Sequence, residues 1–172
     1  MSTTRERMKY DVLIIGAGPS GLSAAIKIKK LASEKNKSIS VCILEKGAEV
    51  GAHIISGAVI ETRALDELLP DWKNNSPPDM IKVTGEEFLF LKKNISFKIP
   101  KFFLPNTLNN RNNYIISLSN FCRWLSKEAE KLGVEIYPGF AAKEVLYSNN
   151  GEVVGVRTGD MGISKNGEKG PS

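Results

Sequence analysis

A glycine-rich turn near the start of the chain is the segment best suited to chemistry. Residues 10–21 read YDVLIIGAGPSG, in which a short apolar run leads into the spacing Gly-x-Gly-x-x-Gly and then into a helical pattern. In such a turn Gly16 permits the tight bend after a strand, Gly18 lets phosphates approach the backbone, and Gly21 lets helix and strand pack closely. The spacing therefore predicts a site for a dinucleotide pyrophosphate.

The residues that follow the turn strengthen this prediction. Pro19 suits the first position of a helix because it lacks an N–H, and from Ser20 onward the helix N-terminus can donate N–H groups to an anion. A second apolar run ends in Glu45, whose carboxylate would accept the ribose hydroxyls of an adenine nucleotide and repel the 2′-phosphate of NADP. The competing interpretation is a glycine turn in an ordinary α/β protein.

The elements that must position these residues follow from the apolar pattern. The first helix carries an apolar stripe, with its lysines (Lys27, Lys29, Lys30 and Lys35) expected to face outward. A second helix is expected after Ser119 as N-cap, with Gly133 as its stop. A hairpin is expected around Asn149-Asn150-Gly151. The expected helices are 19–35, 62–69 and 119–132, and the expected strands are 12–15, 39–44, 88–91, 95–99, 101–104, 134–137, 143–147 and 153–157.

These elements predict an α/β fold of the doubly wound type that contains only its first strands. We expect a first βαβ unit with its cofactor loop over residues 8–60 and a small β-rich excursion over 61–115. A helix and strands would return to the first domain over 116–160, and a polar tail would follow over 161–172. The chain therefore resembles the front portion of a larger protein.

Composition excludes several classes of function. The net charge of +5 is spread along 172 residues without a basic cluster, so nucleic acid is not an expected partner. No run approaches the roughly 20 apolar residues of a spanning helix, and the first nine residues lack the apolar region of a secretory signal. These features favour the cytosol or a membrane that faces it.

The reactive side chains form no familiar catalytic group. His53 is the only histidine, so a multi-histidine metal site is excluded. Cys42 and Cys122 lie far apart within a strand and a helix, which favours buried structural thiols over a metal site or disulfide. We assign no catalytic and no metal-ligating residue, and redox chemistry would then belong to a bound cofactor.

The first glycine motif does not distinguish NAD from FAD. FAD is favoured because the fold starts close to the N-terminus and because a glycine-bearing loop follows Glu45. That loop contains Lys46, Gly51 and His53, and it is long enough to follow a flavin's ribityl chain. We expect all three residues to lie near the cofactor.

Four stretches of the chain, residues 10–32, 40–72, 113–147 and 155–163, resemble the electron transfer flavoprotein–ubiquinone oxidoreductases. The segment GAHIISGAVIETRALDELLPDW carries the most specific part of this resemblance. It implies a glutathione-reductase-like FAD-binding Rossmann domain, FAD as cofactor and a [4Fe–4S] cluster. Such enzymes take electrons from reduced electron transfer flavoprotein and pass them to ubiquinone.

The resemblance also assigns roles to residues. Gly16, Gly18 and Gly21 would hold the pyrophosphate, Glu45 the ribose, and the backbone near Ala142 the adenine. The family's cluster requires four cysteines near its C-terminus, and neither cysteine here matches them, so the fragment alone is expected to be inactive.

A membrane contact is implied as well. The segment from Val50 to Asp71 corresponds to the part that the family dips into one leaflet, and its apolar residues suit a monotopic anchor. Phe102 to Leu104, beside Lys98 and Lys101, form a second candidate. The expected location is the cytoplasmic face of a bacterial inner membrane, or the mitochondrial inner membrane in a eukaryote.

Two other functions remain open at this point. One is an FAD-dependent monooxygenase or a geranylgeranyl-reductase-like enzyme that uses NAD(P)H. The other is a nucleotide-binding module without enzymatic activity.

Overall fold

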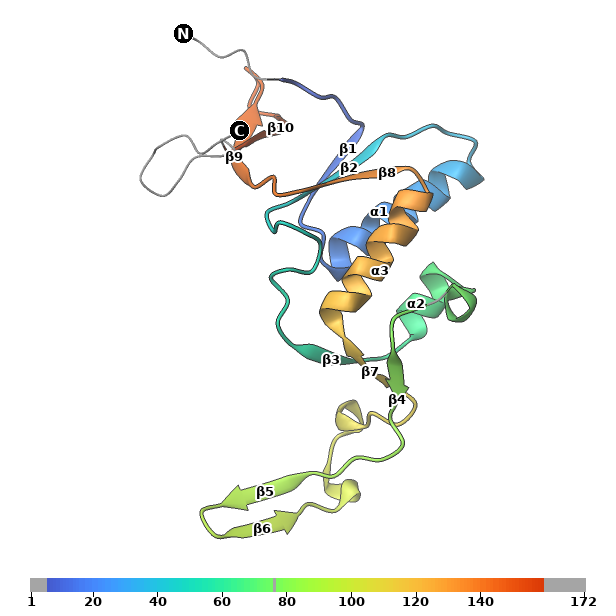
Figure 1. Cartoon of the computed structure of the whole chain (residues 1–172), viewed down its shortest axis with the longest axis vertical. Helices are drawn as coiled ribbons and strands as arrows, with labels where there is room; N and C mark the ends of the chain where they lie inside the picture. Colours follow the sequence, from blue (N-terminus) through green and yellow to red (C-terminus); the bar gives the residue numbers. More distant parts are fainter. Residues whose placement is uncertain (1–5, 76, 160–172) are drawn as a thin grey trace. The chain divides into compact units, whose positions relative to one another are not determined.

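The computed structural model describes residues 6–75 and 77–159. They divide into two compact units (Figure 1). Unit 1 contains the described residues of Met1–Ile54 and Cys122–Ser172, and unit 2 is Ile55–Phe121. The predicted polar tail, 161–172, lies outside the described residues.

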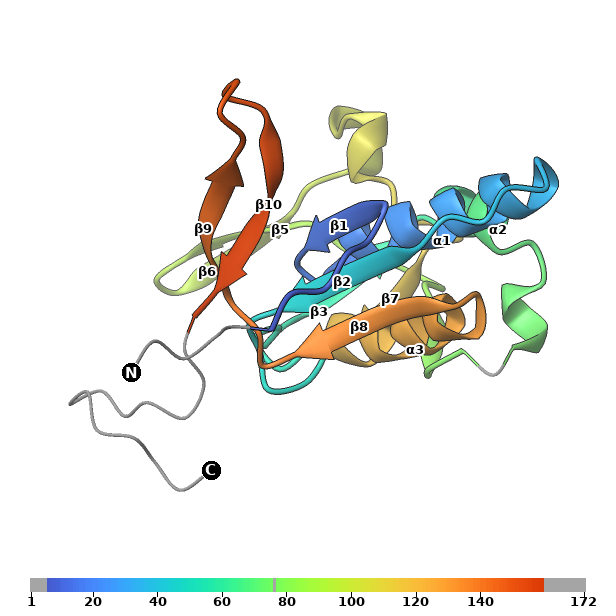
Figure 2. The same cartoon turned by 90° about the horizontal axis from the view of Figure 1, so that it is seen from above.

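A parallel three-stranded sheet forms the centre of unit 1. Its strand order is β1-β2-β8, with Val12 opposite Val41 and Val41 opposite Val134. The two helices that connect these strands lie on the same face of the sheet (Figures 1 and 2). The elements are β1 (Val12–Ile15), α1 (Pro19–Glu34), β2 (Val41–Glu45), α3 (Leu118–Lys131) and β8 (Val134–Pro138).

The apolar patterns explain these elements. All four apolar residues of β2 are buried, as expected for a central parallel strand. The buried stripe of α1 runs from Leu22 to Ala32, and Lys29 lies on it rather than facing outward, because its Nζ donates to the Ile39 carbonyl at 3.0 Å. In α3 the buried residues include Trp124 and Leu125.

Unit 1 also contains the predicted antiparallel hairpin. It consists of β9 (Ala142–Tyr147) and β10 (Val153–Thr158), with Val153 opposite Tyr147. Gly151 in the connecting turn has φ +80°, a left-handed conformation that favours glycine. The turn chemistry therefore explains the hairpin.

Unit 2 is built around a second sheet, which is antiparallel and has the order β3-β7-β4. Trp72 is its most enclosed large side chain; the indole donates to Asp66 Oδ1 at 2.7 Å and meets Tyr114 edge-on. Leu65, Leu69 and Ile116 complete this core. The elements are β3 (Gly57–Ile60), α2 (Arg63–Leu68), the 3₁₀ turn η1 (Trp72–Asn74), β4 (Met80–Lys82) and β7 (Tyr114–Ser117).

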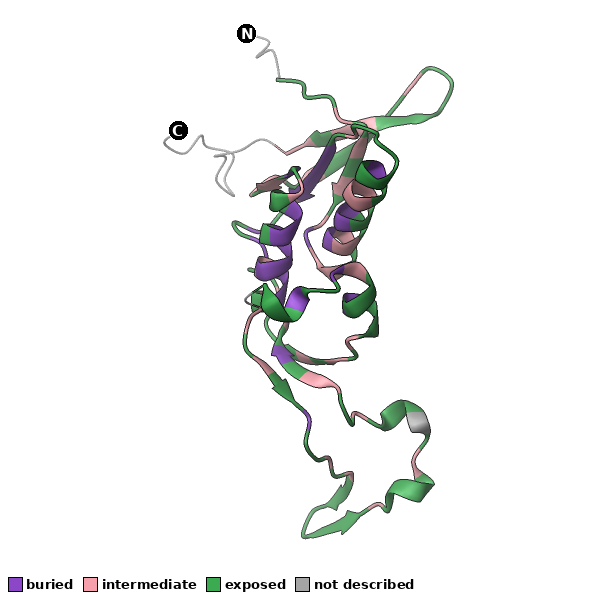
Figure 3. Cartoon of the chain, turned by 90° about the vertical axis from the view of Figure 1, so that its right-hand side faces the viewer, coloured by how far each residue is buried: buried purple, intermediate pink, exposed green. Residues whose placement is uncertain are grey.

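A separate two-stranded hairpin lies between β4 and β7 in the sequence. It is formed by β5 (Leu89–Lys92) and β6 (Ile95–Lys98), and every residue of both strands is exposed (Figure 3). Two 3₁₀ turns follow, η2 (Lys101–Phe103) and η3 (Asn106–Leu108). No helix in the described part of the chain is long and apolar enough to cross a bilayer.

Several sequence predictions differ from the structure. The strand expected at 101–104 is the 3₁₀ turn η2, in which Leu104 N donates to the Lys101 carbonyl. Ser119 is the second residue of α3 rather than its N-cap, because β7 runs directly into the helix at Leu118. Strands β3, β4 and β7 were not predicted.

Candidate nucleotide-binding site

The glycine turn between β1 and α1 has a geometry that other residues could not adopt. Gly16 has φ +100°, and its N–H donates to the Leu44 carbonyl at 2.7 Å. A Cβ on Gly21 would lie 2.1 Å from the Gly16 carbonyl oxygen and 3.2 Å from the Ile14 side chain. The fold itself therefore requires glycine at both positions, as the sequence predicted.

Gly18 differs from these two glycines. Its φ of −79° is open to any residue, and a Cβ built on it would meet nothing within 4 Å. The protein's own packing therefore does not require glycine here. A ligand that approaches the backbone would use the open space, which is the role expected of Gly18 in a phosphate-binding turn.

The N-terminus of α1 opens at this same point. The first N–H bonded within the helix is that of Leu22, which donates to the Gly18 carbonyl at 3.0 Å. Ser20 and Gly21 precede it and have no intrahelical acceptor, while Pro19 has no N–H at all. The first turn of α1 carries neither an acidic residue nor a side-chain cap. The end of the helix is thus suited to an anion.

Glu45 joins the ends of β1 and β2. Its Oε2 accepts from the Ala17 N–H at 2.9 Å, and its Oε1 accepts from the Gly47 N–H at 2.7 Å. Two backbone amides hold the carboxylate, and each oxygen keeps a lone pair for a further donor. The half-buried carboxylate can therefore accept a pair of neighbouring hydroxyls, such as those of a ribose.

The segment after β2 is fixed at two further points. The Gly47 carbonyl accepts from the Gly139 N–H at 2.7 Å, and Gly139 has φ +82° just beyond β8. Arg123 of α3 pairs with Glu49 at 2.8 Å. Sequence reasoning missed these contacts, although the pair Pro138-Gly139 is a turn signal that could have pointed to the first.

The remaining predicted site residues are less closely joined to the turn. Lys46 follows Glu45 and is exposed, and Gly51 is buried with φ +84°. His53 is exposed, and Ala142 is the first residue of β9. In residues 6–75 and 77–159, no hydrogen bond joins His53 or Ala142 to the glycine turn. Their roles stay predictions.

Both cysteines are buried, as predicted. Burial raises the pKa of the Cys122 thiol to about 11, and the Glu45 carboxylate adds to the shift. Burial likewise raises the pKa of Cys42 to about 11, with a smaller contribution from Glu135. Both groups are therefore neutral thiols at pH 7, a form that is neither a good nucleophile nor a metal ligand.

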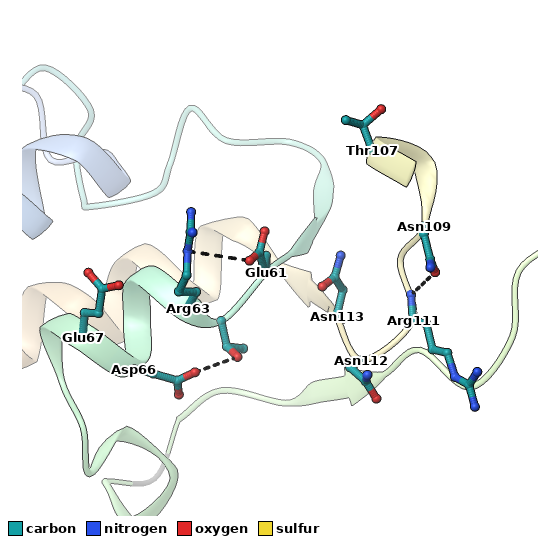
Figure 4. A pocket seen from close by; sticks show the side chains of 10 residues that line it. Glu61, Arg63, Asp66, Glu67, Thr107, Asn109, Arg111, Asn112 and Asn113 are labelled. Carbon is teal, nitrogen blue, oxygen red and sulfur yellow. Dashed lines mark hydrogen bonds and ion pairs between the residues drawn. The ribbon is translucent and has the colours of Figure 1, made fainter. Parts of the chain in front are cut away.

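Unit 2 contains an open polar pocket of its own (Figure 4). Arg63 pairs with Glu61 at 3.8 Å, and Thr62 donates to Asp66 at 3.1 Å. These charged groups bind one another, and among the described residues no group of His, Cys, Asp and Glu could hold a metal ion. The pocket therefore shows no reactive arrangement comparable to the glycine turn.

Comparisons with known proteins agree with this site. Residues 14–72 match the model of the NAD(P)-binding Rossmann-like domain. Solved structures with a similar fold include a myxobacterial FAD-dependent halogenase (TM-score 0.56, 19% identity, 87% of this chain and 32% of that one). A geranylgeranyl bacteriochlorophyll reductase-like protein of Thermoplasma acidophilum is another (TM-score 0.54, 20% identity, 87% and 34%). At these identities the likeness concerns the fold alone, which is thus a Rossmann-like α/β fold.

Curated relatives are much more similar in sequence. The electron transfer flavoprotein-ubiquinone oxidoreductase of Pseudomonas aeruginosa is 57% identical over 164 residues, or 95% of this chain and 30% of the relative. The mitochondrial protein of the same name from Arabidopsis thaliana is 56% identical over 165 residues, or 96% and 25%. This chain therefore spans between 25% and 30% of the length of these relatives. Over nearly its whole length, the chain is related in sequence to the electron transfer flavoprotein–ubiquinone oxidoreductases.

Proposed function

We propose that this chain is the FAD-binding part of an electron-transferring-flavoprotein dehydrogenase. The observation that carries the proposal is the pair formed by the open space at Gly18 and the clamped carboxylate of Glu45. Together they present what a dinucleotide needs, a close backbone approach for phosphates and an acceptor for a ribose. The names of the relatives support FAD chemistry over a simple nucleotide module.

The residues of the site would divide the work of holding FAD. The N–H groups of Ser20 and Gly21 would donate to the pyrophosphate, and Glu45 would accept from the ribose hydroxyls. Bound FAD would supply the redox centre, which side chains of this kind do not provide. Lys46, Gly51 and His53 would border the rest of the cofactor, and the backbone at Ala142 the adenine.

In this proposal, electrons pass from reduced electron transfer flavoprotein to ubiquinone. Both partners are taken from the names of the relatives. A [4Fe–4S] cluster requires four thiolate ligands. Cys42 and Cys122 do not fit, since both are buried neutral thiols on different elements. A cluster would therefore be held by residues outside this chain.

The protein would work on a membrane surface, the inner membrane of a bacterium on its cytoplasmic face or that of a mitochondrion. In the candidate segment from Val50 to Asp71, Leu65 and Leu69 belong to the core of unit 2, whereas Ile55 and Val59 are exposed. The second candidate is stronger, because Phe102 and Phe103 are 79% and 70% exposed and stack on each other. The fully exposed β5–β6 hairpin lies next to it in the sequence.

A matched pair of glycine substitutions tests the cofactor site. Gly18→Ala should abolish FAD retention and leave the thermal unfolding midpoint nearly unchanged, since the new methyl group enters only the ligand's space. Gly21→Ala should lower the midpoint itself, because its Cβ would overlap the Gly16 carbonyl. FAD retention that survives Gly18→Ala would contradict the proposed site.

The rival enzyme class is tested by its electron donor. A monooxygenase or a geranylgeranyl-reductase-like enzyme would have its flavin bleached rapidly by NADPH, whereas the proposed enzyme should respond to reduced electron transfer flavoprotein instead. Stopped-flow absorbance of the complete FAD-loaded protein with each donor separates the two.

A further inference from the structure

The β5–β6 hairpin has two chemically different faces. Residues directly opposite each other in an antiparallel pair share a face, and successive residues alternate. Phe90 lies opposite Phe97, and Lys92 lies opposite Ile95, so these four share one face. The other face carries Leu89 opposite Lys98 and Leu91 opposite Ser96. The first is called the aromatic face below.

The aromatic face is apolar and open. Phe90, Ile95 and Phe97 are each more than half exposed. The same face continues to the base of the hairpin, where Ile99 N donates to the Phe88 carbonyl at 2.8 Å. The opposite face is interrupted by Ser96 and by the Lys98–Glu87 ion pair. Apolar contact is therefore favoured through the aromatic face.

The charges of the hairpin are also unevenly placed. At its base Lys98 pairs with Glu87, and Lys101 pairs with Glu86 at 3.6 Å, which balances the two charges of each pair. Lys92 and Lys93 stand at the turn, and residues 84–105 contain no acidic residue besides Glu86 and Glu87. The end of the hairpin is therefore a local surplus of positive charge on an apolar ribbon.

We infer that the aromatic face and the Lys92–Lys93 turn form a docking surface for the anionic phospholipids of a membrane. This rests on the membrane contact of the proposed function and adds its lipid preference and orientation. Insertion turn-first would carry two ammonium groups into hydrocarbon, which is costly. If the hairpin lies along the interface, the lysine stems can cover apolar surface while their ammonium groups reach the phosphates.

Binding of the full chain to vesicles tests the lipid preference. The probes are vesicles of phosphatidylcholine alone and of phosphatidylcholine mixed with phosphatidylglycerol. Lys92→Gln with Lys93→Gln should reduce partitioning onto the mixed vesicles by about 25-fold, at about fivefold for each lysine. Partitioning onto neutral vesicles should not change. Lys27→Gln with Lys127→Gln removes the same charge from helices and is the matched control.

The orientation has its own matched pair. Phe90→Ser with Phe97→Ser should weaken binding to both kinds of vesicle, and Leu89→Ser with Leu91→Ser should weaken it less. Equal or reversed losses would overturn the assignment of the face. Circular dichroism and the thermal midpoint should be the same in all these variants, because every substituted residue is exposed.

The outcomes separate the inference from the proposed function. Equal binding to neutral and mixed vesicles would overturn the lipid preference and leave the proposed membrane contact standing. No binding to either would overturn the membrane contact as well, while the Gly18 test of FAD binding stays independent. A hairpin-dependent dimer on gel filtration would assign the aromatic face to a second copy of the chain and overturn the inference.

Discussion

Glu45 shows how one side chain can connect two segments and a ligand. Its position after the second strand was predictable, because the spacing from the glycine turn is a known pattern. The two amides that hold it, those of Ala17 and Gly47, were not predictable, since they depend on how the ends of β1 and β2 meet in space. Sequence thus identified the residue but not the reason for its orientation.

The carboxylate should be worth more than its shape. Glu45→Gln keeps the size of the side chain but removes the charge that strengthens its hydrogen bonds to the ribose. We expect FAD affinity to fall by about 2 kcal/mol, or roughly thirtyfold in Kd, as measured by flavin fluorescence titration. Glu49→Gln is the control, because Glu49 is exposed and pairs with Arg123. Equal losses in the two variants would remove the special role of Glu45.

At the scale of elements, the reliability of prediction followed the range of the interactions. Helix α1, strand β2 and the β9–β10 hairpin carry their signals within a short window of sequence. Strand β3 pairs with β7, so that Gly57 meets Ser117, and neither strand exceeds four residues. Such strands are specified by a distant partner. The apolar pattern of Leu65 and Leu69 also fits either a core or a lipid surface, and here it makes a core.

The register of β1 and β2 is fixed where both strands begin. Asp11 accepts from the backbone N–H and hydroxyl of Ser40, and these bonds lower the pKa of the Asp11 carboxyl. A lowered pKa stabilises the fold above the unfolded value of about 3.9, and this contribution is lost as pH falls through the folded value.

Acid unfolding should reveal this contribution. The parent chain should lose part of its stability below about pH 4, and Asp11→Asn should lose less over the same range because it cannot be protonated. Urea midpoints by circular dichroism at pH 7 and pH 3 measure the difference. Asp79→Asn, at an exposed position, should follow the parent, and parallel curves for all three proteins would contradict the expectation.

Trp72 should be the most sensitive position in unit 2. It is 2% exposed, and its indole donates to Asp66. Trp72→Ala should therefore cost about 3–5 kcal/mol in the free energy of unfolding, as measured by urea denaturation. Phe102→Ala removes an aromatic ring that is 79% exposed and should change it by less than about 0.5 kcal/mol. Similar costs would place Trp72 outside the core.

At the scale of the whole molecule, the candidate nucleotide site belongs to unit 1. The glycine turn, Glu45 and Gly47 all lie within it. ADP carries the adenine, ribose and pyrophosphate of FAD, so it should slow amide hydrogen exchange in residues 16–22 and 44–47. Protection confined to residues 107–113, which line the pocket of unit 2, would instead favour that pocket as the nucleotide site.

The two buried tryptophans have a practical consequence. The sequence contains only these two, with Trp72 in the core of unit 2 and Trp124 on α3 within unit 1. Each half of the molecule thus carries its own intrinsic fluorophore. Single-tryptophan versions, made by Trp→Phe at the other position, would report the melting of one half at a time. A flavin seated at the glycine turn could also be detected by energy transfer from Trp124.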